Sequence, residues 1–169
     1  MGFSEIKKEL KKLEKDRIID LISDLYKKNN AVKEYLDFYT NPNEKEILIK
    51  YKVKVYEAFY PKRGYGFKLS NGKKAISDFK KLEPSKEYIA DLMLYYVETG
   101  VIFTNEFGDI DEPFYNSMES VFHQALKLME KESILELFKD RAQKVVKDTS
   151  GIGWGFHDGL SYTYYEFYH

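Results

Sequence analysis

Apolar side chains recur three and four positions apart along most of this chain of 169 residues. This spacing is the period of an α-helix, whereas strict alternation, which places every second side chain on one face of a strand, is scarce. Ile18, Leu21, Ile22 and Leu25 show the helical pattern over two turns. We therefore predict an all-α protein.

Capping and turn residues divide the pattern into eight or nine helices. The segment Asn41-Pro42-Asn43-Glu44 marks the start of one helix, and Pro61 marks its end. We expect Gly100 to end another helix and residues 101–113 to be irregular. The terminal helix is predicted near residues 157–168.

Successive helices joined by short connections form antiparallel hairpins. The sequence Lys-Lys-Leu-Glu occurs at positions 11–14 and again at 80–83, each time between two predicted helices. Such an echo is expected of hairpins stacked side by side in an α-solenoid-like right-handed superhelix. Chance similarity between amphipathic hairpins of an irregular bundle explains it as well, so both arrangements stay open.

The composition suits one helical domain over residues 1–169, with 43% apolar and 33% charged residues. The chain has no cysteine, which excludes disulfides, thiolate metal sites and cysteine nucleophiles. No apolar run is long enough to span a bilayer, and the N-terminal residues lack the apolar core of a secretory signal. We expect a cytoplasmic protein without a membrane partner.

The formal net charge of −1 hides a strong asymmetry between the two halves of the sequence. Residues 1–81 form a basic half with 20 Lys and Arg against 12 Asp and Glu, a net charge of +8. Residues 82–169 form an acidic half with 7 against 16, a net charge of −9. The asymmetry indicates either contact of the basic half with a polyanion, or contact between the halves within one chain or between chains.

A loop in the basic half carries aromatic and basic side chains. Residues 63–67, Arg-Gly-Tyr-Gly-Phe, match the first five positions of an RNA-binding signature, but Lys68 breaks the match and the flanking segments are helical. Nucleic-acid binding would combine phosphate attraction with base stacking; solvated lysines on helix faces are the alternative. The candidate residues for this surface are Lys62, Arg63, Tyr65 and Phe67.

Acidic residues and histidines of the acidic half have the chemistry of a divalent-cation site. Carboxylate oxygens and imidazole nitrogens are suitable ligands if the segments that carry them fold together. In the alternative interpretation Asp111 or Glu112 caps the following helix, and Glu119 and His123 form a surface pair. No other cofactor is expected. The candidate ligands are Glu106, Asp109, Asp111, Glu119, His123, His157 and Asp158.

Glycines at positions 151, 153, 155 and 159 surround Trp154 and Phe156. The segment lacks the Gly-Lys-Ser/Thr ending of a phosphate-binding loop. The two aromatic side chains are expected to anchor the terminal helix, or to form part of a binding surface.

Two stretches, Thr-Asn-Glu-Phe-Gly-Asp-Ile-Asp-Glu-Pro-Phe-Tyr at 104–115 and Asp-Thr-Ser-Gly-Ile-Gly-Trp-Gly-Phe-His-Asp at 148–158, are distinctive. Together with the opening helices they resemble an uncharacterised family of small bacterial cytosolic proteins, a domain of unknown function. The resemblance covers essentially the whole chain. It implies a compact helical protein of bacterial origin, and it supplies no activity, ligand or catalytic residue.

Three functions are consistent with these observations. The first is a non-enzymatic binding or scaffold module that contacts a protein partner or a second copy of itself. The second is a divalent-metal-dependent enzyme at the acidic and histidine residues, and the third is nucleic-acid binding by the basic half.

Overall fold

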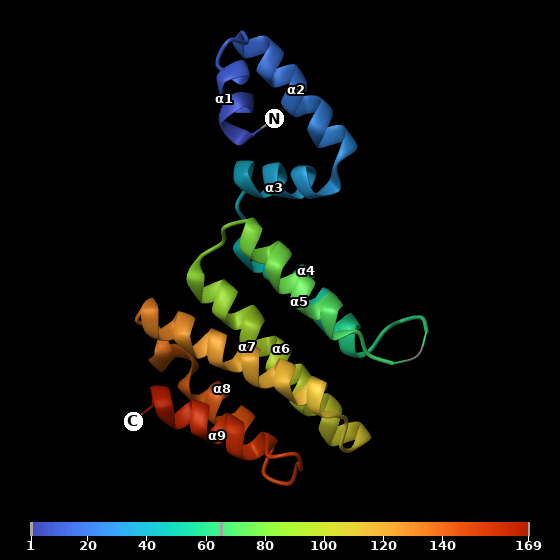
Figure 1. Cartoon of the computed structure of the whole chain (residues 1–169), viewed down its shortest axis with the longest axis vertical. Coiled ribbons are helices and arrows are strands. Elements are labelled where there is room, and N and C mark those ends of the chain that lie inside the picture. Colours follow the sequence, from blue (N-terminus) through green and yellow to red (C-terminus); the bar gives the residue numbers. More distant parts are fainter. Residues whose placement is uncertain (1, 65, 169) are drawn as a thin grey trace. The chain divides into compact units, whose positions relative to one another are not determined.

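The computed structural model describes residues 2–64 and 66–168, which form nine α-helices and no strand (Figure 1). The predicted all-α fold is confirmed. The chain separates into two compact units, unit 1 (Met1–Asn43) and unit 2 (Glu44–His169), and one domain over 1–169 stays a prediction. The helices are α1 (Phe3–Leu10), α2 (Lys15–Lys28), α3 (Asn30–Thr40), α4 (Glu44–Phe59), α5 (Leu69–Lys81), α6 (Lys86–Phe107), α7 (Glu112–Lys131), α8 (Leu135–Lys147) and α9 (Phe156–Phe167).

Unit 1 holds α1, α2 and α3, of which α2 and α3 contact each other. Asn29 caps α3, because its side-chain oxygen accepts hydrogen bonds from the backbone N–H groups of Ala31 and Val32. Tyr26 of α2 donates a hydrogen bond of 2.8 Å to Asp37 of α3. No helix residue in the described part of this unit is buried, so unit 1 has no core of its own.

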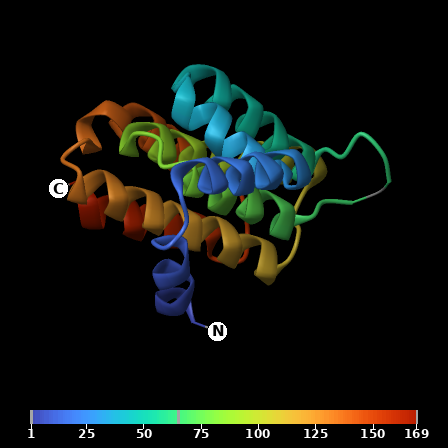
Figure 2. The ribbon, with the colours of Figure 1, turned by 90° about the horizontal axis from the view of Figure 1, so that it is seen from above.

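Unit 2 consists of three successive hairpins, α4–α5, α6–α7 and α8–α9, whose paired helices run in opposite directions (Figures 1 and 2). The first hairpin packs on the second through contacts of α4 and α5 with α6. The third packs on the second through contacts of α8 and α9 with α6 and α7. The predicted antiparallel hairpins are therefore present, while their winding into a right-handed superhelix stays a prediction.

The core of unit 2 is built around α6. Its residues Leu92, Leu94, Tyr96 and Val97 have no solvent-exposed surface, and the helix contacts α4, α5, α7 and α8. A helix that is apolar on several faces requires this kind of burial. None of the described helices, α6 included, combines the length and apolar character that a membrane crossing requires.

The prediction that Gly100 ends a helix is wrong, because α6 continues through this position to Phe107. Gly100 is buried against α7, and the sulfur of Met118 occupies the place where a β-carbon would stand. The glycine thus permits two helices to approach closely. The helix ends instead at Gly108, whose φ of 84° favours glycine, and the irregular segment begins there.

We expect Gly100→Ala to destabilise unit 2 by about 1–3 kcal/mol, because the added methyl group displaces Met118 or separates α6 from α7. Urea unfolding followed by circular dichroism measures the change. Gly151→Ala is the control, since a β-carbon there meets no atom within 4 Å. Alanine has the higher helix propensity, so a stabilised Gly100→Ala variant would contradict the close approach.

Candidate binding surfaces

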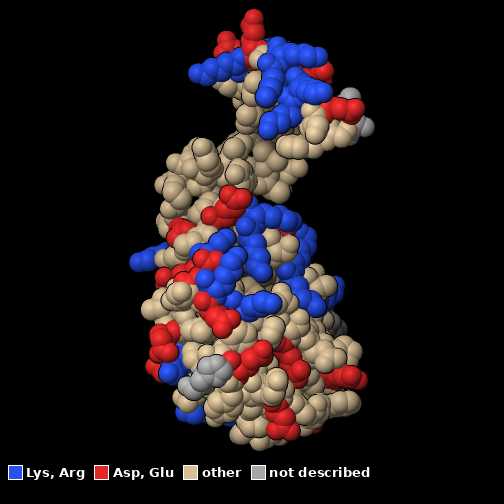
Figure 3. Space-filling model, turned by 60° about the vertical axis from the view of Figure 1, so that its left-hand side comes forward, with Lys and Arg blue, Asp and Glu red and all other residues tan. Residues whose placement is uncertain are grey.

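The positive charge of the sequence is concentrated in the first hairpin of unit 2. Residues 44–81 carry 11 Lys and Arg against 4 Asp and Glu, a net charge of +7, whereas residues 1–43 carry 9 against 8. On the face seen in Figure 3, blue Lys and Arg atoms form a group in the middle of the picture and red Asp and Glu atoms predominate below it. The basic region is thus mainly a property of α4, α5 and the loop between them.

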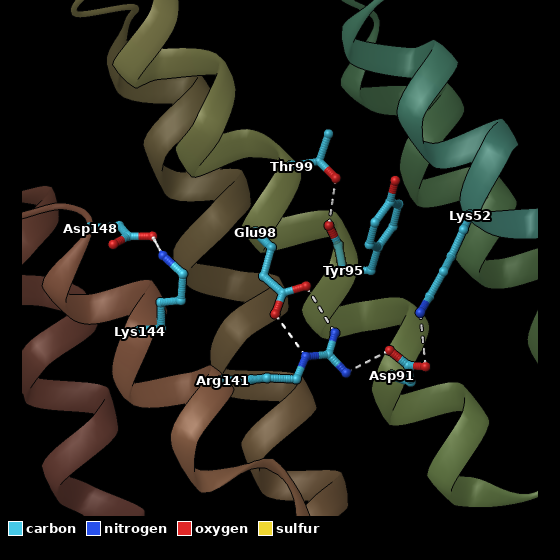
Figure 4. A network of polar contacts seen from close by, with 8 residues as sticks. All are labelled: Lys52, Asp91, Tyr95, Glu98, Thr99, Arg141, Lys144 and Asp148. Atoms are coloured by element: carbon cyan, nitrogen blue, oxygen red, sulfur yellow. Dashed lines mark hydrogen bonds and ion pairs between the residues drawn. The ribbon is translucent and has the colours of Figure 1, made fainter. Parts of the chain in front are cut away.

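A network of ion pairs connects three helices of unit 2 (Figure 4). Arg141 of α8 donates two hydrogen bonds of 2.8 Å to the carboxylate of Glu98 and one of 2.7 Å to Asp91, both on α6. Lys52 of α4 donates a bond of 2.9 Å to the other oxygen of Asp91. One lysine of the basic half therefore meets a carboxylate of the acidic half within the chain.

The electrostatics of this network favour the charged forms. Burial opposes the charge of Arg141, but hydrogen bonds and attraction from Glu98 and Asp91 outweigh it and raise its pKa. A guanidinium is suited to the position because its planar fork contacts both oxygens of one carboxylate. All four charged groups have partners, so the network serves to hold α4, α6 and α8 together.

The structure places the first predicted cation ligands at separate positions. Asp111 accepts a hydrogen bond of 2.9 Å from the backbone N–H of Phe114 and caps α7, as the alternative interpretation expects. Glu106, near the end of α6, accepts one of 2.6 Å from the hydroxyl of Tyr60. Both carboxylates thus have protein partners.

The remaining candidate ligands follow the contact between α7 and α9. Glu119 lies against Gly159, where an added β-carbon would stand 2.8 Å from the carboxylate, and burial raises the pKa of Glu119. His123, one turn further along α7, has its Nε2 3.9 Å from Glu166. The Nδ1 of His157 lies 3.1 Å from the hydroxyl of Thr149, while Asp158 is exposed.

These side chains do not assemble into a donor set. Among the residues that the structure describes, which include all seven candidates, no group of three or more His, Asp or Glu is placed to hold a metal ion. The hypothesis of a metal-dependent enzyme is therefore not supported by a cluster of ligands among the described residues.

The two distinctive stretches, 104–115 and 148–158, do meet. Asn105 donates a hydrogen bond of 2.9 Å to the backbone carbonyl of Asp148, and an added β-carbon on Gly153 would lie 3.0 Å from a carboxylate oxygen of Asp109. Phe156 is fully buried, its ring 4.6 Å from that of Tyr115, and it anchors α9. Trp154, in the second of these stretches, is 62% exposed and does not anchor α9.

The aromatic and basic loop is only partly a surface. The ring of Phe67 packs on Phe103 and Phe114 at 5.4 and 5.2 Å, which places it in the aromatic core. Lys62 pairs with Glu57 at 2.5 Å, and Arg63 is exposed. Tyr65, the other expected stacking residue, lies outside the described residues.

Helix α4 carries an exposed apolar stripe that the sequence reasoning missed. Ile49, Val53 and Tyr56 of α4 border a hollow of about 320 Å³ against Tyr95 of α6, together with the half-buried Tyr60 that follows the helix. The signal was present in the sequence, since these positions recur with the same helical period as the buried residues of α4. A helix of unit 2 is therefore apolar on two faces, only one of which is covered.

The fold and these surfaces define a helical protein of stacked hairpins with exposed apolar faces. The model of a family of unknown function, DUF6155, matches residues 1–167, and the chain belongs to this family. No curated protein and no solved structure matches the chain. The match agrees with the resemblance to an uncharacterised family, and it names no activity.

We expect Arg141→Met to destabilise the protein by about 2 kcal/mol, because two half-buried carboxylates lose their charged partner. Lys144→Met, in an exposed pair with Asp148 one turn along the same helix, should cost less than about 0.5 kcal/mol. Urea unfolding of both variants tests this. Equal losses would show that the network adds nothing to an ordinary surface pair.

Glu119→Gln should make the protein more stable at neutral pH than the unsubstituted chain. Because the pKa of Glu119 is higher in the folded state, the folded state keeps the carboxyl proton up to a higher pH than the unfolded state. The free energy of unfolding therefore falls as the pH rises through the native pKa. The gain should vanish well below the ordinary value of 4.5. Thermal unfolding across pH measures it, with Glu130→Gln on the exposed side of α7 as the control; a gain independent of pH would contradict the assignment.

Proposed function

We propose that the protein is a non-enzymatic binding module that associates with a second copy of itself through the apolar faces of unit 1. The observation that carries the proposal is the lack of any buried helix residue in the described part of this unit. Amphipathic helices are stabilised mainly by covering their apolar faces. The helices of unit 1 do not bury those faces against one another.

The clearest of these faces lies on α2. Leu21, Ile22 and Leu25 are 44%, 43% and 45% exposed, and with Ile18 they have the spacing i, i+3, i+4, i+7. Helices that dock into apolar grooves or pair with other helices use this spacing for their anchoring residues. Full burial of each side chain contributes about 1.5–3 kcal/mol.

The polar contacts of unit 1 hold this face in a defined geometry. Lys33 donates hydrogen bonds of 2.8 Å to the Tyr26 hydroxyl and 2.6 Å to Asp37, and Tyr26 itself bonds to Asp37. The three side chains come from both α2 and α3. The stripe on α2 is therefore presented by a helix whose partner α3 is joined to it through side-chain hydrogen bonds.

A second copy is the partner that the chemistry of unit 1 favours. The unit has nine basic and eight acidic side chains, so two copies do not repel each other strongly. Unit 1 is close to the size of about 40 residues below which isolated domains usually depend on disulfides, a metal or oligomerisation, and this chain has no cysteine. Most oligomers of one chain are twofold symmetric, so we expect a dimer.

The resemblance of residues 104–115 and 148–158 to a family of bacterial cytosolic proteins supports a bacterial cytoplasm as the place of this module. Fractionation of cells that express the untagged chain tests the location, and recovery outside the cytosolic fraction would contradict it.

Sedimentation equilibrium of the full chain tests the self-association. We expect a dimer whose dissociation constant rises by at least about a hundredfold in Ile22→Glu/Leu25→Glu, because two charges enter each apolar face. Lys15→Gln/Lys27→Gln changes the net charge by the same amount on exposed lysines and should leave the dimer intact.

Circular dichroism verifies that both variants keep their helices, and Ile22→Ala/Leu25→Ala provides a milder change that preserves helix propensity. A monomeric full chain across the concentration range of the experiment would overturn the proposal. A dimer that the apolar substitutions leave unchanged would also overturn it.

A further inference from the structure

Unit 2 has a second hollow, of about 460 Å³, between α5, α6 and α7. Its volume lies in the range of small-molecule sites. Its lining combines positive charge, hydroxyl and amide groups with an apolar floor, and none of its residues is among the candidate site residues predicted from the sequence. The residues that line it are Lys73, Ile76, Ser77, Lys80, Lys81, Met93, Ser120, Val121 and Gln124.

Helix α5 supplies the basic wall. Lys73, Ser77 and Lys80 are spaced by four and three residues, so they share one face of the helix. The helix lies close to α6 because Gly72 has no side chain; an added β-carbon would stand 2.6 Å from the ring of Tyr96. The position of this basic face beside α6 is therefore fixed by backbone packing.

Helices α6 and α7 supply the floor and the opposite wall. Met93 and Val121 are buried apolar residues, and Ile76 of α5 joins them in the lining. Gln124 donates a hydrogen bond of 3.0 Å to the Ser120 hydroxyl oxygen. This bond leaves the Ser120 hydroxyl proton and the Gln124 carbonyl oxygen free to contact a ligand.

The positive charge of this hollow is poorly compensated. The side chains of Lys73 and Lys80 have no hydrogen bond or ion pair with any residue that the structure describes, and Lys81 shares Asp78 with Lys74. Partial withdrawal of Lys80 from water, together with repulsion from Lys86, lowers the pKa of Lys80. An anion beside Lys80 would favour its charged form and so oppose this lowering of the pKa.

We propose that this hollow binds a small organic oxyanion, a carboxylate or phosphate group attached to an apolar body. Lys73 and Lys80 hold the charged oxygens, while Ser77, Ser120 and Gln124 offer hydrogen bonds at the rim. Ile76, Met93 and Val121 cover the apolar body. The site lies within unit 2 and does not depend on the self-association of unit 1.

Titration of the full chain, labelled with carbon-13 at isoleucine, methionine and valine methyl groups, tests the site by NMR. The probes are hexyl phosphate, hexanoate, 1-hexanol and inorganic phosphate. Hexyl phosphate or hexanoate should saturate the shifts of Ile76, Met93 and Val121, and comparison of the two identifies the preferred head group. The alcohol and inorganic phosphate each lack half of the ligand and should bind at least about tenfold more weakly.

Lys73→Gln/Lys80→Gln should weaken the favoured probe by at least about tenfold, and added salt should weaken its binding to the unsubstituted chain. Lys45→Gln/Lys68→Gln makes the same change of charge on exposed lysines elsewhere and should bind normally. The absence of a saturable shift with both anionic probes would overturn the proposal. So would unchanged affinity in Lys73→Gln/Lys80→Gln, or equal binding of 1-hexanol, which would indicate an apolar site alone.

Discussion

The burial of α6 is the constraint on which the rest of unit 2 depends. Its apolar residues face several directions, so other helices must cover it on more than one side. Two of these contacts require glycine: Gly100 admits Met118 of α7, and Gly72 of α5 lies against Tyr96. The cover of α6 comes from α4 and α5 before it in the chain and from α7 and α8 after it.

The polar side of α6 explains part of the charge asymmetry of the sequence. Asp91 and Glu98 remain half-buried at the edge of the core, where unpaired carboxylates would be costly. Arg141 comes from the acidic half and Lys52 from the basic half, and together they compensate both carboxylates. The excess of lysine in the first hairpin is only partly neutralised in this way, so Lys73 and Lys80 remain available to an external anion.

Features set by neighbouring residues were predictable from the sequence, whereas features set by tertiary contacts were not. The helical period predicted the fold class, and the Asp111 cap depends on a backbone N–H three residues away. Gly100 was predicted as a helix end because glycine is common there. Its actual role depends on contact with Met118, which lies eighteen positions further along the chain and is not visible in the local sequence. Five of the seven candidate cation ligands lie within residues 106–123, but the helices direct Glu119 toward Gly159 and His123 toward Glu166. Phe67 lies in the aromatic core because its ring packs on Phe103 of α6 and Phe114 of α7, which are distant in sequence.

The two units differ in the exposure of their apolar side chains, which are mostly buried in unit 2 and accessible in the described part of unit 1. Unit 2 covers most of its apolar side chains by its own helices. In the described part of unit 1 the same kind of side chains stay accessible. If a second copy covers them, association and the stability of α1–α3 become one linked equilibrium that depends on protein concentration. The proposed anion site lies in unit 2, so in this proposal one chain combines a concentration-dependent contact in unit 1 with a ligand site in its other unit.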